Sequence, residues 1–198
     1  MKRTLSPCLT LLLIALMSVS AFAQDLSTSF STGNGDVFIG EDTEWEAEDP
    51  FSDAPILNLR AKEGMAVAKA TLIEGTRTTV YTAKTIRYAL ATEEFLLEGD
   101  AKIQRGDEFL SGPTQIKYDP AKLIMILAGT DKNPAQILYN PPKQAKIFSE
   151  AETFTFRFKK TGEDKELVSI SSKGHKTFRR GESINVPKDA VPRKASGS

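Results

Sequence analysis

Apolar and polar residues alternate with a period of two along much of this chain, and that pattern limits the fold more than any other feature. Phe154, Phe156 and Phe158 are separated by Thr155 and Arg157. Alternate side chains of a strand point to opposite faces, so this run predicts a strand with one aromatic face and one solvent-facing side. After residue 24 no stretch keeps an apolar period of 3.6 residues, so we expect little helix. Short strands with regular turns predict an all-β fold, a β-jelly roll or open β-sandwich of repeated antiparallel hairpins.

A repeat runs through the alternating segments. The first copy runs from Ile86 to Gly99 and the second from Ile116 to Gly129, so that matching positions are 30 residues apart. In both copies a tyrosine follows the isoleucine by two positions. A looser third copy covers residues 154–174 and has a longer charged turn. Each copy predicts a hairpin, and repeated hairpins stack into one long sheet in which each buries its apolar face on the next.

The alternation also predicts which side chains face the interior. They are Ile86, Tyr88, Phe95, Leu97, Ile103, Ile116, Tyr118, Met125, Leu127, Phe154, Phe156, Phe158, Val168 and Ile170. Such a face can line a groove for an acyl chain, whose methylenes each gain about 0.8 kcal/mol on burial. Any β-sandwich needs a similar face for its own core, so the pattern leaves both interpretations open.

The N-terminus has the pattern of a secretory signal peptide. Lys2 and Arg3 precede an apolar run of 11 residues from Leu9 to Val19, and Ala21-Phe22-Ala23 fits the small-residue cleavage rule. A membrane span needs about 20 apolar residues, which is longer than this run. We therefore predict that residues 1–23 are a signal peptide cleaved after Ala23. The alternative is an uncleaved N-terminal anchor.

Cysteine usage and net charge exclude several classes of protein. Cys8 is the only cysteine and lies within the predicted signal peptide, so the mature chain has no disulfide, thiolate metal site or cysteine nucleophile. From residue 24 onward the chain has 24 basic and 26 acidic residues, a net charge of −2. That balance gives no indication of nucleic-acid binding.

The charges are unevenly distributed, and this divides the chain into segments. Residues 24–64 have 10 acidic and 2 basic residues, net −8, whereas residues 173–198 have 2 acidic and 7 basic residues, net +5. We predict that residues 24–55 form an acidic, largely flexible leader, with Asp36–Ile39 as a possible short strand. The acidic stretch from Glu41 to Asp49 lacks the spacing of a calcium loop. Residues 56–178 form the predicted β-domain, and residues 179–198 form a basic C-terminal tail.

The chain offers few groups for catalysis. His175 is the only histidine, and it lies among lysines, which is typical of a surface residue. Glu93, Glu94, Glu98 and Asp100 are near one another in sequence, but their positions on strands and turns indicate the solvated face of a hairpin. No glycine-rich phosphate loop occurs. We expect no enzymatic activity, no metal and no cofactor.

The repeat resembles that of a known family. The segment Ala-x-x-Ile-x-Tyr at residues 83–88, the run Phe-Leu-Leu-Glu-Gly-Asp-Ala-Lys-Ile at residues 95–103, and the continuation from Gly112 to Gly129 resemble the repeat of the OstA-like (LptA) family. That family comprises periplasmic lipopolysaccharide-transport proteins and domains. The resemblance covers approximately residues 56–174.

The resemblance implies a β-jelly roll that is open at both ends, with an apolar interior that holds lipid acyl chains. It implies no enzymatic activity, a location in the periplasm, and lipopolysaccharide or a related lipid as ligand. It also implies other Lpt-type envelope proteins as partners and end-to-end assembly, for which the acidic head and basic tail favour a head-to-tail homo-oligomer. The alternative function is a non-enzymatic structural or interaction β-module of the cell envelope that binds protein and no lipid.

Overall fold

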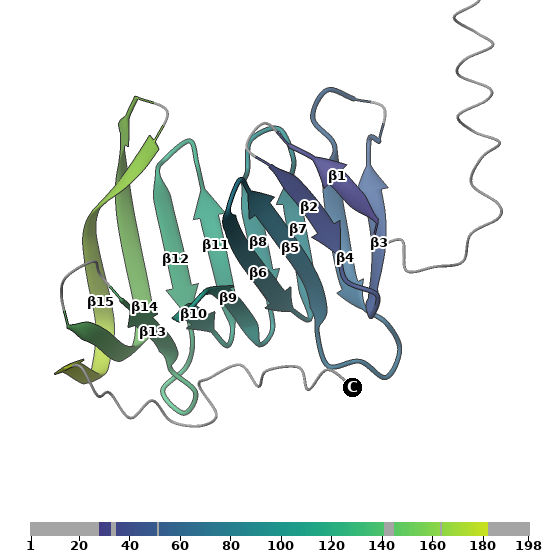
Figure 1. The fold of residues 1–198 in the computed structure, drawn as a ribbon. Helices are drawn as coiled ribbons and strands as arrows, with labels where there is room; N and C mark the ends of the chain where they lie inside the picture. The colour runs from purple at the N-terminus through teal and green to yellow at the C-terminus, as the bar shows by residue number, and fades with distance from the viewer. Residues whose placement is uncertain (1–27, 33–34, 51, 141–144, 163, 182–198) are drawn as a thin grey trace, which may run out of the picture.

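The computed structural model describes residues 28–32, 35–50, 52–140, 145–162 and 164–181, and in these ranges the chain is all-β (Figure 1). The predicted signal peptide and most of the predicted basic tail lie outside the described residues. The strands are β1 (Ser29–Ser31), β2 (Asp36–Ile39), β3 (Thr43–Glu48), β4 (Ile56–Ala61), β5 (Ala68–Glu74), β6 (Arg77–Ala83), β7 (Thr85–Ala89), β8 (Phe95–Glu98), β9 (Ala101–Arg105), β10 (Glu108–Gly112), β11 (Gln115–Asp119), β12 (Ile124–Ala128), β13 (Ala135–Tyr139), β14 (Lys146–Thr161) and β15 (Asp164–Gly181).

All described strands belong to one antiparallel sheet that folds over on itself. Its order is β1-β2-β5-β6-β9-β10-β13-β14-β12-β11-β8-β7-β4-β3, with β15 paired to β14. We call β1, β2, β5, β6, β9, β10 and β13 half-sheet A, and β3, β4, β7, β8, β11 and β12 half-sheet B. Successive hairpins are placed alternately in the two half-sheets. The sheet is not closed, so the expected open β-sandwich of antiparallel hairpins is confirmed.

This alternation explains the 30-residue repeat. The two aligned copies are the hairpins β7–β8 and β11–β12 of half-sheet B, and one hairpin of half-sheet A separates them in sequence. The glycine that ends each copy lies where the chain crosses between half-sheets. Gly99 has a φ of 70°, a conformation that favours glycine. At Gly129 a Cβ would collide with the backbone of Asn133 and Ala135.

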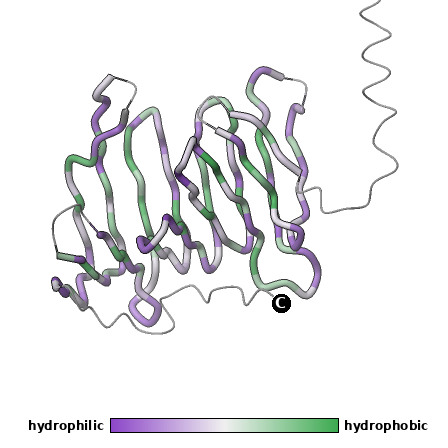
Figure 2. Tube along the Cα trace, viewed as in Figure 1, coloured by the Kyte–Doolittle hydropathy of each residue, from purple (hydrophilic) through white to green (hydrophobic). Residues whose placement is uncertain are grey.

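Register brings the apolar residues of half-sheet B into continuous rows. One row crosses the strands through Leu59, Ile86, Leu97, Ile116, Leu127 and Phe154, and a second through Leu57, Tyr88, Phe95, Tyr118, Met125 and Phe156. All of these side chains are buried in one core between the half-sheets. Figure 2 shows the hydrophobic positions along the strands and the hydrophilic ones mainly at the turns.

The two ends of the folded sheet differ. The first part of β14 pairs with β13 of half-sheet A, and its second part pairs with β12 of half-sheet B, so β14 joins the half-sheets at the C-terminal end. At the other end the sheet finishes in β1 and β3, which are separate ends of the strand order. The interior is therefore bounded by a continuous sheet at one end and by two free strand edges at the other.

The prediction of a largely flexible leader needs correction for the described part of residues 24–55. The possible strand at Asp36–Ile39 is confirmed as β2, and β1 and β3 also belong to the sheet. The acidic residues do not prevent this, because Glu44 and Glu48 point away from the core and find partners there. Glu44 lies 3.3 Å from Arg60, and Glu48 accepts a 2.7 Å hydrogen bond from Asn58. The predicted domain boundaries at residues 55 and 178 fall before β4 and inside β15.

Candidate functional site: the apolar interior

The structure places most of the predicted interior residues between the half-sheets. The buried ones are Ile86, Tyr88, Phe95, Leu97, Ile103, Ile116, Tyr118, Met125, Leu127, Phe154 and Phe156. Phe158 is half-buried and packs against the same core. Register and burial fix the position of these side chains, and their contact with lipid stays a prediction.

Two predicted interior residues on β15 are exposed. Val168 is 59 % exposed because β15 has a bulge there: Ser169 pairs with Arg157 and Leu167 with Phe158, which leaves Val168 without a partner in the register. Leu167 takes the inward place instead. Ile170 pairs with Phe156 and shares its face, but it is 39 % exposed because β15 is the last strand at this end.

Apart from Ile103 on β9, the sequence patterns missed the part of the interior that comes from half-sheet A and from β4. These residues are Val37, Ile39, Leu57, Leu59, Ala68, Ala70, Leu72, Tyr81, Ala83, Ala101, Ala135 and Ile137. They lie outside the copies that the repeat aligns. The spacing of two positions in Leu57–Leu59 and in Ala68, Ala70 and Leu72 was the signal that could have found several of them.

Aromatic rings connect the two half-sheets inside the core. We call Tyr81, Tyr88, Phe95, Tyr118 and Phe158 the aromatic cluster. Tyr81 comes from half-sheet A, and its ring centre lies 5.5 Å from Phe95 and 6.4 Å from Tyr88 of half-sheet B. Phe95 continues to Tyr118 at 5.5 Å, and Tyr118 continues to Phe158 at 6.1 Å. Edge and tilted contacts of this kind add to the burial of the rings.

Burial changes the acidity of two hydroxyl groups in this cluster. The pKa of Tyr81 is raised well above its ordinary value, first by burial and then by the nearby Tyr88 and Glu74. The pKa of Tyr88 is raised in the same direction by burial and by Glu93 and Glu74. Both groups therefore stay neutral and can donate hydrogen bonds over the whole physiological range.

An ion pair lies beside the aromatic cluster at the tips of two hairpins. Lys165 of β15 donates a 2.7 Å hydrogen bond to Glu93, which lies in the turn between β7 and β8. The same ammonium lies 5.2 Å from the ring centre of Tyr118. Burial lowers the pKa of Lys165, but its interactions with Glu93 and with the Tyr118 hydroxyl together outweigh burial and leave the pKa above its ordinary value.

At the opposite end, two aromatic rings meet across the gap between the free edges. Phe30 of β1 and Trp45 of β3 lie with their ring centres 5.0 Å apart in an edge-to-face arrangement. Trp45 is 43 % exposed, whereas Phe30 packs against the core. A side-chain contact thus takes the place that a hydrogen-bonded strand pair would have in a closed sheet.

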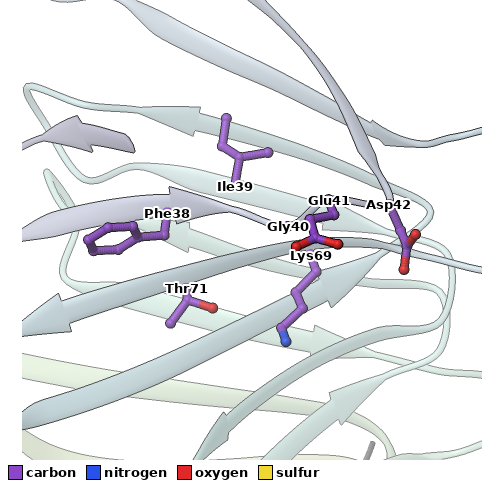
Figure 3. A pocket seen from close by; sticks show the side chains of 7 residues that line it. All are labelled: Phe38, Ile39, Gly40, Glu41, Asp42, Lys69 and Thr71. Carbon is purple, nitrogen blue, oxygen red and sulfur yellow. The ribbon is translucent and has the colours of Figure 1, made fainter. Parts of the chain in front are cut away.

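The surface has shallow hollows outside the interior. One of about 310 Å³ is lined by Phe38, Ile39, Gly40, Glu41, Asp42, Lys69 and Thr71, as Figure 3 shows. Another of about 370 Å³ lies over β3, β4, β7 and β8, where its charged lining includes Glu46, Arg60 and Arg87. Neither has the apolar lining of an acyl-chain site. In the core itself the side chains between the half-sheets fill the space and are shielded from solvent.

The groups considered for catalysis are dispersed over the surface. His175 lies on β15 opposite Ala151 and is exposed. Glu93 is paired with Lys165, and Asp100 lies 3.6 Å from Lys84. Within the described ranges no three histidine, cysteine or acidic residues come together as a metal site, and no helix is long and apolar enough to cross a membrane.

The charged segments lie at opposite ends of the sheet. The acidic stretch includes β3, which is one free edge, and the basic residues Lys173, Lys176, Arg179 and Arg180 lie on β15. Lys188, Arg193 and Lys194 lie outside the described residues. Val168, Ile170 and Phe178 add exposed apolar side chains to β15. β15 therefore presents both basic and apolar side chains to solvent.

Comparison with known proteins identifies no relative: no protein-family model, no curated protein and no solved structure matches this chain. The function is therefore argued from the residues and the fold.

The buried tyrosines predict a loss of stability at high pH. Their folded-state pKa values lie above the unfolded-state value of about 10, so their contribution is complete below pH 10 and is lost as the pH rises beyond it. Denaturant unfolding at a series of pH values should show a falling free energy of unfolding above pH 10. Tyr81→Phe should reduce that slope. An unchanged slope in Tyr81→Phe would contradict the assignment.

Proposed function

We propose that this chain is a periplasmic, non-enzymatic lipid-binding protein of lipopolysaccharide transport to the outer membrane. It holds acyl chains in the interior between half-sheets A and B and forms a bridge by head-to-tail assembly, as the LptA-type proteins that its repeat resembles do. The observation that carries the proposal is the pair of continuous apolar rows that cross half-sheet B and face half-sheet A.

The physical basis for lipid binding is the amount of apolar surface in those rows. Each acyl methylene that moves from water into contact with those rows lowers the free energy by about 0.8 kcal/mol. The interior is closed by its own side chains in this structure, so an acyl chain has to enter as the half-sheets separate. Separation is easiest at β1 and β3, where no strand pairing joins the half-sheets. The contacts there are the ring pair of Phe30 and Trp45 and the hydrogen bonds between the Thr43 hydroxyl and the backbone of Lys69 on β5.

The basis for assembly is that β3 and β15 each have one backbone edge without a partner among the described strands. β15 pairs on one side with β14, and its other backbone edge has no partner among the described strands. An exposed edge of this length favours addition of another strand. Because β3 is acidic and β15 is basic, joining unlike ends is favoured over joining like ends. Such contacts are heterologous and can continue from copy to copy.

The location rests on residues 1–23. Their charged start, short apolar run and small-residue cleavage site support export through a cleavable signal peptide. A mature protein that begins at Gln24 and resides in the periplasm would meet lipopolysaccharide on its way to the outer membrane.

A second candidate function is a structural or interaction β-module of the envelope that binds protein and no lipid. The filled interior favours it, since a core that stays closed needs no ligand. The two candidates differ in what accompanies the protein when it is purified.

The proposed lipid binding predicts lipopolysaccharide in the purified protein. Mass spectrometry of protein from the periplasmic fraction should give an intact mass that begins at Gln24, and solvent extracts should contain lipopolysaccharide. Phe156→Asp should remove the lipid, because it puts a charge into the apolar row. Thr155→Asp, on the other face of the same strand, is the matched control and should keep it.

The thermal melt of each variant is measured beside its lipid content, so that unfolding is separated from loss of binding. A wild-type extract without lipid, or a folded Phe156→Asp variant with wild-type lipid content, would contradict the lipid-binding function and favour the structural module.

The proposed assembly predicts oligomers that depend on concentration and salt. Light scattering at low salt should show an average molar mass that rises with protein concentration for the wild type. The variant Lys173→Glu/Arg180→Glu on β15 should stay monomeric. Exposed charges are screened over about 8 Å at physiological salt, so added salt should weaken assembly. Glu46→Lys on β3, mixed with the β15 variant, should restore mixed oligomers because it reverses the opposing charge.

The matched control is Arg77→Glu/Lys117→Glu, which reverses the same number of charges at exposed positions of β6 and β11. A wild type that stays monomeric at every concentration would exclude the bridge. An effect of this control equal to that of the β15 variant would show that net charge, and not the edge, governs assembly.

A further inference from the structure

One buried hydroxyl in the interior has no hydrogen-bond acceptor in the described part of the chain. Tyr118 is 8 % exposed, and its hydroxyl meets no hydrogen-bond acceptor among the described residues, since the nearby Lys165 ammonium can only donate. A buried hydroxyl without a hydrogen bond lowers stability, and replacing it with an apolar group of the same shape is neutral or favourable. A ligand that supplies a hydrogen-bond acceptor to this hydroxyl would therefore be stabilised in the interior.

The hydroxyl lies at the boundary between the apolar interior and solvent. The ammonium of Lys165 sits 5.2 Å from the centre of the Tyr118 ring and is bonded to Glu93. The side chains of this pair are 31 % and 23 % exposed, so they stand between the core and the surface. On the core side, Tyr118 contacts Phe95, beyond which lies the fully buried row that contains Leu97.

The charges near this boundary are balanced. Lys165 is neutralised by Glu93, and Arg105 lies 3.6 Å from Glu74, whose charge is felt by Tyr81 and Tyr88. A phosphate or carboxylate would meet no excess of positive charge here. A neutral acceptor fits better, since neutral tyrosine hydroxyls donate hydrogen bonds to carbonyl oxygens without any change of charge.

We propose that Tyr118 is a ligand-binding residue that donates a hydrogen bond to the carbonyl oxygen of an ester or amide linkage at the head of an acyl chain. The ring of Tyr88 stacks on Phe95 with the ring centres 6.5 Å apart, and the tail of the ligand lies along the apolar rows. This inference rests on the proposed lipid-binding function. The inference adds the position of each part of the ligand. The hydrocarbon lies in the core, the ester or amide linkage lies at Tyr118, and the head group lies outside the Lys165–Glu93 pair.

The experiment compares two probes that differ in the carbonyl alone, a monoacylglycerol and the 1-O-alkylglycerol of the same chain length. Calorimetry with the full-length protein should show the ester probe binding about tenfold more tightly than the ether probe. Tyr118→Phe keeps the ring and should bind both probes with the affinity that the wild type has for the ether. Its melting temperature should equal or exceed that of the wild type.

Tyr139→Phe is the matched control, because it removes a hydroxyl from the exposed end of β13 and should leave both affinities unchanged. If the wild type binds neither probe, the lipid-binding function is wrong and this inference with it. If it binds both equally and Tyr118→Phe changes nothing, lipid binding stands and the carbonyl site is wrong. A lower melting temperature of Tyr118→Phe would show a structural partner and would also overturn the site.

Discussion

Each strand of half-sheet B carries an apolar side, and the rows that these sides form can leave water only if the sheet folds onto itself. Leu97, Ile116 and Leu127 follow one another across three paired strands, and half-sheet A covers them. Hydrophobic burial of these rows is the interaction on which the rest depends, because a chain with a single cysteine has no internal disulfide to hold it. The alternating placement of hairpins follows from it, since each hairpin needs a facing partner.

The two ends of the folded sheet differ in how the half-sheets are joined. β14 pairs with both half-sheets and fixes their spacing at the C-terminal end. At the N-terminal end the half-sheets meet through the Phe30–Trp45 ring contact and the hydrogen bonds of Thr43 with the Lys69 backbone. The continuous strand pairing of β14 resists separation more strongly than these few contacts do. The acidic β3 and the basic β15 also lie at opposite ends of the sheet. The proposed entry of a ligand and the proposed assembly of copies both rest on this difference between the ends.

The predictable part of the molecule is the part with a strong period of two. The all-β fold, the β2 strand and the inward position of residues such as Ile86 and Phe154 followed from it. Tyr81 was missed because half-sheet A lies outside the aligned copies, and Val168 was misplaced because a bulge shifts the register where no pattern announces it. That the Tyr118 hydroxyl finds no acceptor among the described residues depends on distances between strands, which the alternation of apolar and polar residues does not contain.

The most direct test of the central claim, that the interior opens to acyl chains from the end between β1 and β3, uses the single tryptophan. Trp45 stands at that end, and bromine on an acyl chain quenches tryptophan emission on contact. Trp45 fluorescence is measured with a saturating monoacylglycerol brominated along its chain and with the unbrominated probe. The account predicts strong quenching by the brominated probe alone. Equal emission with both probes would contradict it.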